Sequence, residues 1–200
     1  MSNNTLTYWF PDKSSFRYID AGLISPTAAK AMEEEKQIRD GWLMHPQIGI
    51  GSGQKMIDVG SRYGEYTLSA LALGADFVWA FEKNPQLVKY LREMLRINNN
   101  SFVERCSVIN RVISPITTNL DHYFFEELSS VPDGVKWLKI DVGGQDELNI
   151  LFGARKLVEY YSPISVLVHH YDGQAGHQAL TEQFLAANGY DAKSVGIKIS

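Results

Sequence analysis

The sequence of 200 residues contains a single cysteine, Cys106, so no disulfide can form within the chain. Cys106 lies in an apolar run, which predicts a buried, inert thiol and is compatible with a reducing compartment. The sequence also lacks an apolar run long enough to span a membrane, and its N-terminus lacks the basic and apolar regions of a secretory signal. We therefore expect a soluble, cytoplasmic protein without a membrane partner.

Positive charge is scarce as well. The chain has 19 Lys and Arg against 23 Asp and Glu, a formal net charge of -4, and no basic cluster. This balance argues against nucleic acid as a partner, because such binding depends on neutralising phosphates. The 44% of hydrophobic residues suffice for one core, so we expect a single domain over residues 1–200. Within it, residues 1–50 form an arm and a helix, and residues 51–200 form the core.

The dinucleotide-binding fingerprint G-x-G-x-x-G is missing too, which disfavours a nicotinamide enzyme. Instead, Gly60 and Gly64 bracket a tight turn. The apolar run 56–59 before the turn is typical of a buried parallel strand. Residues 66–73 after the turn have the length of a helix, which Gly74 would end. The stretch therefore predicts a strand, a glycine turn and a helix in succession.

A second apolar strand, residues 77–81, follows and ends on Glu82. Glycines let a backbone approach a ligand, and the start of a helix offers free N–H groups to an anion. Glu82 could accept both hydroxyls of a ribose, and Asp58 could meet a cationic group. A ligand with a ribose, an ammonium and a carboxylate fits this layout better than a dinucleotide. The alternative is a sheet in which the glycines only turn the chain.

The rest of the chain continues the alternation of strands and helices. We expect strands at 102–109, 135–141 and 164–168, and helices at 85–98, 146–161 and 176–188. A further helix should run from Ser25-Pro26 to about Gly41, and the tail 190–200 can supply one strand. Residues 114–134 give no clear pattern and could carry substrate contacts or form a covering helix. The alternation predicts an α/β fold, mainly a parallel sheet with helices on both faces.

Candidate catalytic groups follow the later strands. Lys139 and Asp141 share one face of a strand, and a nearby ammonium would hold Asp141 ionised. Asp141 could instead be a turn or capping acid. His169 could deprotonate a hydroxyl, but only one of the pair His169-His170 easily joins a given site, because adjacent strand residues point to opposite faces. Structural histidines are the alternative, and a metal site is disfavoured, so no metal is expected.

Two motifs together carry a family resemblance. The segment DVGSRYGEYT at 58–67 and the segment WLKIDVGGQD at 137–146, followed by LFGAR at 151–155, resemble FkbM-type S-adenosylmethionine-dependent methyltransferases. The patterns of that family read approximately DVGANxGxYT and LLKIDVEGxE…LxGAR. The segment TTNLD at 117–121 is also similar to a TLD segment of the family. The resemblance covers roughly residues 55–190.

The resemblance implies a Rossmann-like class I methyltransferase fold and methyl transfer from S-adenosylmethionine, usually to a hydroxyl oxygen. The acceptor would be a small molecule or a carbohydrate. The expected catalytic residues are Asp141, Lys139 and His169. The expected cofactor-binding residues are Asp58, Gly60, Ser61, Gly64, Tyr66, Thr67, Glu82, Lys83 and Arg111.

Two positions depart from the family pattern. Gly143 stands where the family has glutamate, and Arg62 stands where asparagine or a small residue is usual. Asp146 or Gln145 could replace the lost glutamate in positioning the substrate. If neither does, the chain would be a non-catalytic cofactor-binding protein with a degraded acceptor site. A nucleic-acid methyltransferase is a further alternative, disfavoured by the acidic pI and by the lack of an N/D-P-P-Y/F/W segment.

Overall fold

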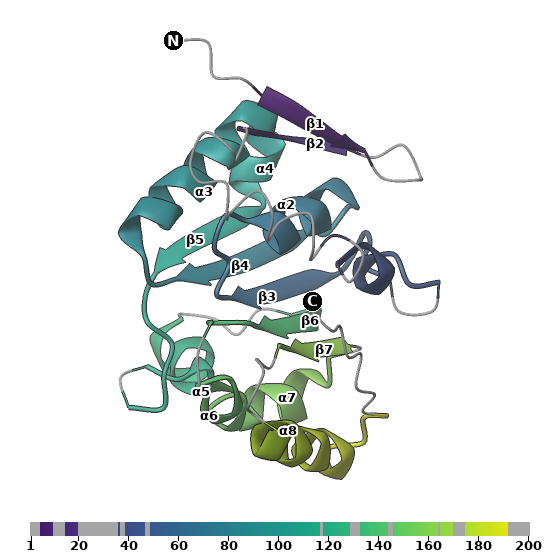
Figure 1. Ribbon diagram of the computed structural model, residues 1–200, viewed down its shortest axis with the longest axis vertical. Helices are drawn as coiled ribbons and strands as arrows, with labels where there is room; N and C mark the ends of the chain where they lie inside the picture. Colours follow the sequence, from purple (N-terminus) through teal and green to yellow (C-terminus); the bar gives the residue numbers. More distant parts are fainter. Residues whose placement is uncertain are drawn as a thin grey trace.

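Five parallel strands form the central sheet, in the order β5-β4-β3-β6-β7 (Figure 1). The computed structural model describes residues 5–9, 15–19, 36, 39–46, 49–116, 118–128, 133–143, 146–163, 165–169 and 175–191. The strands are β3 (Lys55–Val59), β4 (Phe77–Glu82), β5 (Cys106–Asn110), β6 (Val135–Ile140) and β7 (Ser165–Val168). The predicted α/β class with a parallel sheet is confirmed.

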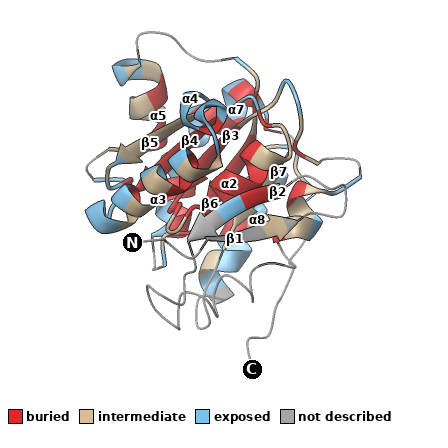
Figure 2. Ribbon diagram, turned by 90° about the horizontal axis from the view of Figure 1, so that it is seen from above, coloured by how far each residue is buried: buried red, intermediate tan, exposed pale blue. Residues whose placement is uncertain are grey.

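Helices cover both faces of this sheet, because alternate side chains of each buried strand point to opposite sides. On one face, Val78 and Ala80 of β4 pack with α2 (Glu65–Ala72), α3 (Pro85–Asn98) and α4 (Asn100–Glu104). On the other face, Trp79 and Phe81 join the core formed with α5 (Leu120–His122), the π-helical turn η2 (Tyr123–Glu127), α6 (Glu147–Phe152), α7 (Arg155–Tyr161) and α8 (Ala175–Ala187). Figure 2 shows the strands buried between the helices.

An antiparallel hairpin of β1 (Thr5–Trp9) and β2 (Ser15–Ile19) packs beside α3 (Figure 1). The Arg17 backbone N–H donates to Asn98 Oδ1 at 2.6 Å, and Asn98 Nδ2 donates to the Arg17 carbonyl at 2.7 Å. Residues 39–43 are helical, so the helix expected to reach about Gly41 is seen at its end. Its predicted start at Ser25 and the tail from 192 onward lie outside the described residues.

The predicted strand at 102–109 is wrong in its first half. Residues 100–104 form the short helix α4, and the strand β5 begins only at Cys106. The Asn99 side chain accepts a hydrogen bond from the Phe102 N–H at 2.9 Å and so caps this helix. A short apolar run such as Phe102-Val103 shows no periodicity by which a helix could be told from a strand. Here the capping asparagine favours the helix.

The predicted helix at 146–161 is two helices, α6 and α7, that meet at Gly153 and Ala154. A β-carbon at Gly153 would lie 2.8 Å from the Asn119 side chain, so the break lies where another segment comes very close. The Asp121 carboxylate accepts hydrogen bonds from the N–H groups of Lys156 and Leu157, at 2.9 and 2.8 Å. A distant segment therefore starts the second helix, which local sequence cannot reveal.

The interval 114–134, for which the sequence shows no clear pattern, contains Asn119 and Asp121. Within its described part, α5 and η2 cover the sheet, and Leu120 and Phe124 are fully buried in the core. The covering-helix interpretation is therefore the one that the structure supports. No helix of the described ranges is both long enough and apolar enough to cross a membrane.

Candidate cofactor and catalytic site

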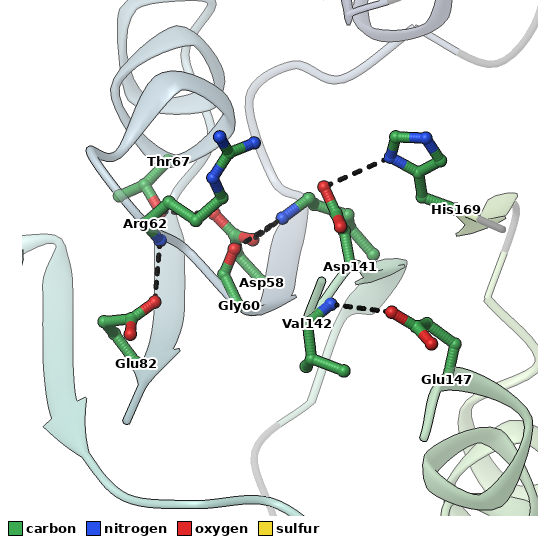
Figure 3. Close-up of polar contacts among 10 residues, drawn as sticks. Asp58, Gly60, Arg62, Thr67, Glu82, Asp141, Val142, Glu147 and His169 are labelled. Carbon is green, nitrogen blue, oxygen red and sulfur yellow. Dashed lines mark hydrogen bonds and ion pairs between the residues drawn. The ribbon is translucent and has the colours of Figure 1, made fainter. Parts of the chain in front are cut away.

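The strand order reverses between β3 and β6, because the chain adds β4 and β5 on one side of β3 and then β6 and β7 on the other. In open parallel sheets, ligands bind at such a switch point, beyond the carboxyl ends of the strands. Gly60 follows β3, Glu82 ends β4, Asp141 follows β6 and His169 follows β7. These four predicted site residues therefore lie at one edge of the sheet (Figure 3).

The two glycines of the turn after β3 are required by the packing of the protein itself. Gly60 has φ +79°, and a β-carbon there would lie 1.8 Å from the Asp141 carbonyl oxygen. Gly64 has φ +90°, and its β-carbon would meet Leu91 at 2.3 Å. L-residues with a side chain rarely adopt such angles, so both positions need glycine. The loop after β3 thereby packs closely against the backbone at the end of β6.

Glu82 is held rigidly at the end of β4. Its Oε2 accepts a hydrogen bond from the Arg62 N–H at 3.0 Å (Figure 3). Its Oε1 accepts one from the Asn84 N–H at 2.7 Å. An ionised carboxylate has about four acceptor sites, so both oxygens can accept a further hydrogen bond. Arg62 itself has φ +48°, a left-handed conformation that asparagine tolerates better. The left-handed backbone explains why asparagine suits position 62, where the resembling family usually has it or a small residue and this chain has arginine.

Asp58 was expected to meet a cationic group of a ligand, and in the structure it pairs with a cation of the protein itself. The Asp58 side chain is fully buried, Lys139 Nζ donates to its Oδ1 at 2.9 Å, and Thr67 Oγ1 donates to its Oδ2 at 2.7 Å. Lys139 Nζ also donates to the Gly60 carbonyl at 2.9 Å. Asp58 and Thr67 therefore hold the glycine loop, α2 and β6 together beneath the carboxyl ends of the strands.

Lys139 is a buried cation and carries its charge at neutral pH. Burial acts to lower the pKa of Lys139, but the carboxylates of Asp58 and Asp141 outweigh it, so the pKa is raised above its usual value. The ammonium also lies 5.0 Å from the centroid of the Tyr66 ring. Tyr66 and Lys139, both predicted site residues, thus form part of one charge network under the site.

Asp141 and His169 face each other across the ends of β6 and β7 (Figure 3). The distance from His169 Nδ1 to Asp141 Oδ2 is 3.3 Å. The backbone N–H of Asp141 donates to the Val59 carbonyl and that of His169 donates to the Ile140 carbonyl, both at 3.0 Å. The strand ladders therefore fix both residues. His170, the other predicted candidate, lies outside the described residues.

The remaining cofactor candidates differ in position. The Ser61 hydroxyl is buried beside Gly60 and makes no hydrogen bond to any described residue, so a ligand could supply its partner. The Arg111 guanidinium pairs instead with the Glu127 carboxylate, Nη1 to Oε2 at 2.5 Å, and the Lys83 side chain is exposed. Ser61 therefore fits a role in ligand binding better than Arg111 or Lys83.

Two buried acids of this region escaped the prediction. Glu65 begins α2 and its charge raises the pKa of Lys139, and Glu147 accepts a hydrogen bond from the Val142 N–H at 3.2 Å. Glu147 lies on the face of α6 that also carries the buried Ile150 and Leu151, and a charge inside such an apolar stripe was the available signal. Asp146 is exposed, and Gln145 lies outside the described residues.

Metal binding has no support in the described ranges, where no three His, Cys, Asp or Glu side chains are grouped so as to hold an ion.

The groups at the site fit a nucleoside ligand better than a metal ion. Glu82 offers two oriented oxygens, Ser61 offers a buried hydroxyl, and the glycine turn leaves backbone without a side chain at Gly60 and Gly64. These groups fit S-adenosylmethionine, whose ribose hydroxyls, ammonium and carboxylate need donors and acceptors of this kind.

The fold is the Rossmann-like fold of class I methyltransferases. The methyltransferase FkbM from Methylobacillus flagellatus is similar over 80% of this chain, with a TM-score of 0.57 and 20% identity. Precorrin 8w decarboxylase from Methanobacterium thermoautotrophicum matches over 84% of the chain (TM-score 0.53, 16% identity), and the METTL16 methyltransferase domain matches over 80% (TM-score 0.52, 15% identity). Their own chains are covered to 45%, 75% and 59% respectively.

The chain thus spans less than half the length of the FkbM structure that it matches. No protein-family model and no curated protein matches the sequence. At 15 to 20% identity, the structural likenesses establish the fold, and the names of these proteins differ in reaction and acceptor. The chemistry of this chain has to be inferred from its own residues.

Proposed function

We propose that this chain is a cytoplasmic, single-domain methyltransferase that uses S-adenosylmethionine to methylate a hydroxyl oxygen of a small molecule or sugar. The observation that supports this most strongly lies at the switch point of the sheet, where the Glu82 carboxylate is held by two backbone N–H groups and the Ser61 hydroxyl in the glycine turn has no hydrogen-bond partner among the described residues. The shared fold of methyltransferases supports the same proposal.

In this proposal, the two Glu82 oxygens accept the ribose hydroxyls, and Gly60, Ser61 and Gly64 carry the loop that contacts the rest of the cofactor. Asp58 and Lys139 keep that loop attached to β6. When bound, S-adenosylmethionine supplies a methyl group activated by a sulfonium. The protein's own task is then to align the acceptor oxygen with that methyl group and to remove the acceptor's proton.

The proposed acceptor class rests on Asp141 and His169, the carboxylate and imidazole that lie 3.3 Å apart after the carboxyl ends of β6 and β7. An imidazole titrates in the range suited to accepting a hydroxyl proton. The net charge of -4 gives no general attraction for nucleic acid, which favours a small acceptor over RNA.

A second candidate function has an observation in its favour. Gly143 is exposed, has φ +72° and offers no carboxylate where the resembling family has glutamate. The carboxylate of Glu147 nearby binds the Val142 N–H. A protein that binds S-adenosylmethionine without transferring its methyl group is therefore the alternative.

Methyl transfer from S-adenosylmethionine with a labelled methyl group separates these possibilities. The purified chain would be incubated with three separate pools: small alcohols and sugars, RNA, and peptides. We expect label only in the first pool, in ether linkages that survive mild base. Label confined to RNA or peptides would refute the proposed acceptor. Cofactor binding without transfer to any pool would favour the binding protein.

A further inference from the structure

The pair formed by Asp141 and His169 has the arrangement of a base and the group that orients it. We propose that His169 is the general base of methyl transfer, with Asp141 as the positioning residue that accepts a hydrogen bond from its Nδ1–H and leaves Nε2 to receive the acceptor's proton. This inference rests on the proposed function and assigns the residue that makes the acceptor oxygen nucleophilic.

Exposure divides the roles within the pair. The Asp141 side chain keeps 2% of its surface exposed, whereas the His169 side chain keeps 30%. Nδ1 is the ring nitrogen that lies 3.3 Å from Asp141 Oδ2, and Nε2 lies across the ring from it. The buried carboxylate is therefore suited to hold the ring, and the partly exposed ring is suited to meet an acceptor. A backbone hydrogen bond at each residue limits movement of the pair.

Charge supports the same order of roles. A series of side chains leads from β3 to the imidazole: Asp58, Lys139, Asp141 and His169, of which the first three alternate in charge. The charge of Asp141 is among the causes that raise the pKa of Lys139. An ionised Asp141 favours the tautomer with the proton on Nδ1, and it stabilises the imidazolium that forms when Nε2 gains a second proton.

The step balances without any further reactant. The acceptor O–H bond breaks and its proton goes to Nε2 of His169, while the oxygen forms a bond to the methyl carbon. The bond between that carbon and sulfur breaks, and its electron pair stays on sulfur, which becomes a neutral thioether. His169 then returns the proton to solvent through its exposed side. A hydroxyl needs such help because it holds its proton at neutral pH.

The tautomer of His169 tests this inference without any acceptor. Long-range ¹⁵N–¹H NMR spectra of the uniformly labelled protein above pH 8 distinguish the protonated ring nitrogen from the unprotonated one, and His169→Gln identifies the signal. We expect the proton on Nδ1. A proton on Nε2 in the wild-type protein would overturn the inference, because Nε2 would then have no lone pair for the substrate.

Two acidic variants complete the test. In Asp141→Asn, the preference for Nδ1–H should weaken, whereas the matched variant Asp146→Asn, at an exposed acid five residues later, should leave it unchanged. An unchanged tautomer in Asp141→Asn would show that Asp141 does not set it. With an acceptor in hand, His169→Gln should reduce kcat by about 10²- to 10⁴-fold with unchanged cofactor affinity, and an unaltered kcat would refute the base.

Failure of the inference and failure of the proposed function give different results. If S-adenosylmethionine does not bind, methyl transfer is excluded whatever the tautomer of His169. If it binds and is used while the proton lies on Nε2, the methyltransferase stands and another group is the base.

Discussion

Gly60 lies at the most constrained point of the candidate site. Its left-handed φ and the absence of a side chain let the Asp141 carbonyl oxygen occupy the space of a β-carbon. The same residue brings its own carbonyl to Lys139, whose ammonium binds Asp58. The glycine is therefore needed for the close approach of the ends of β3 and β6.

Gly60→Ala should consequently destabilise the protein. The left-handed backbone costs an alanine about 1 kcal/mol, and forcing a methyl group into the Asp141 backbone should add about 1–3 kcal/mol. The matched control is Gly51→Ala, where a β-carbon meets nothing within 4 Å and φ is not left-handed. Urea unfolding of the two variants checks this. Equal stabilities would contradict the packing described for Gly60.

At the scale of elements, one ion pair connects the two central strands. Asp58 of β3 and Lys139 of β6 are neighbours in the strand register, both are buried, and Thr67 of α2 joins them. Leaving a buried charge without its partner is costly, whereas removing both charges costs less. The contribution of each residue of the pair to stability therefore depends on the presence of the other.

Lys139→Met should lower the free energy of unfolding by about 3–5 kcal/mol, while Lys89→Met on the exposed face of α3 should change it by less than about 0.5 kcal/mol. Adding Asp58→Asn to Lys139→Met should cost less than the sum of the two single variants, with a coupling of about 1 kcal/mol or more. Strict additivity in urea unfolding would mean that the two residues act independently.

A second element-scale prediction concerns the start of α7. Asp121 accepts hydrogen bonds from the N–H groups of Lys156 and Leu157, so Asp121→Ala should cost about 1–2 kcal/mol. Asp121→Asn should cost less, because an amide oxygen can still accept. Asp146→Ala is the matched control, since Asp146 precedes α6 without a side-chain cap. A loss in the control as large as in Asp121→Ala, by thermal unfolding, would argue against capping.

The sequence could predict the elements whose signals are local. The β3–α2–β4 unit follows from an apolar run, two glycines and a second apolar run, and it is found within one or two residues of the prediction. The break at Gly153 could not be predicted, because its cause is the approach of Asn119, and the cap on α7 comes from Asp121. Such long-range contacts leave no periodic pattern in the segment that they alter.

The same limit applies to the candidate site. The positions of Glu82, Asp141 and His169 follow from the rule that ligands bind at the carboxyl ends of parallel strands. The partner of Asp58 does not follow from that rule, because Lys139 lies 81 residues away in the sequence. The sequence also does not reveal that the Arg111 guanidinium, a predicted cofactor contact, pairs with Glu127. Long side chains can reach several partners, and the sequence does not say which.

For the whole molecule, ionisable groups with raised pKa values predict alkaline sensitivity: Lys139 is buried, and Cys106 and Tyr190 are partly buried. Burial raises the pKa of the Cys106 thiol and raises the pKa of Tyr190 to about 12, and the pKa of Lys139 is raised as well. The unfolded chain loses these protons from about pH 9 upward, while the folded protein keeps them. Above that pH the unfolded state binds fewer protons, so stability must fall as pH rises.

Urea unfolding across pH should therefore show a constant midpoint from pH 7 to about 8.5 and a decline above about pH 9. Each fully shifted group contributes up to about 1.4 kcal/mol per pH unit, less where solvent reaches it. Cys106→Ala should remove the earliest part of the decline. A midpoint that stays flat to pH 10.5 would contradict the burial of these groups.

The central claim is that the site at the carboxyl ends of the strands binds S-adenosylmethionine through Glu82, and calorimetric titration tests it most directly. Wild-type protein should bind S-adenosylmethionine saturably and should not bind NAD. Glu82→Ala should weaken binding by about tenfold or more, equivalent to about 1.4 kcal/mol, while Glu104→Ala, at an exposed acid of α4, should leave it unchanged. A well-folded wild-type protein that binds no S-adenosylmethionine would contradict the proposal and leave a likeness of fold alone.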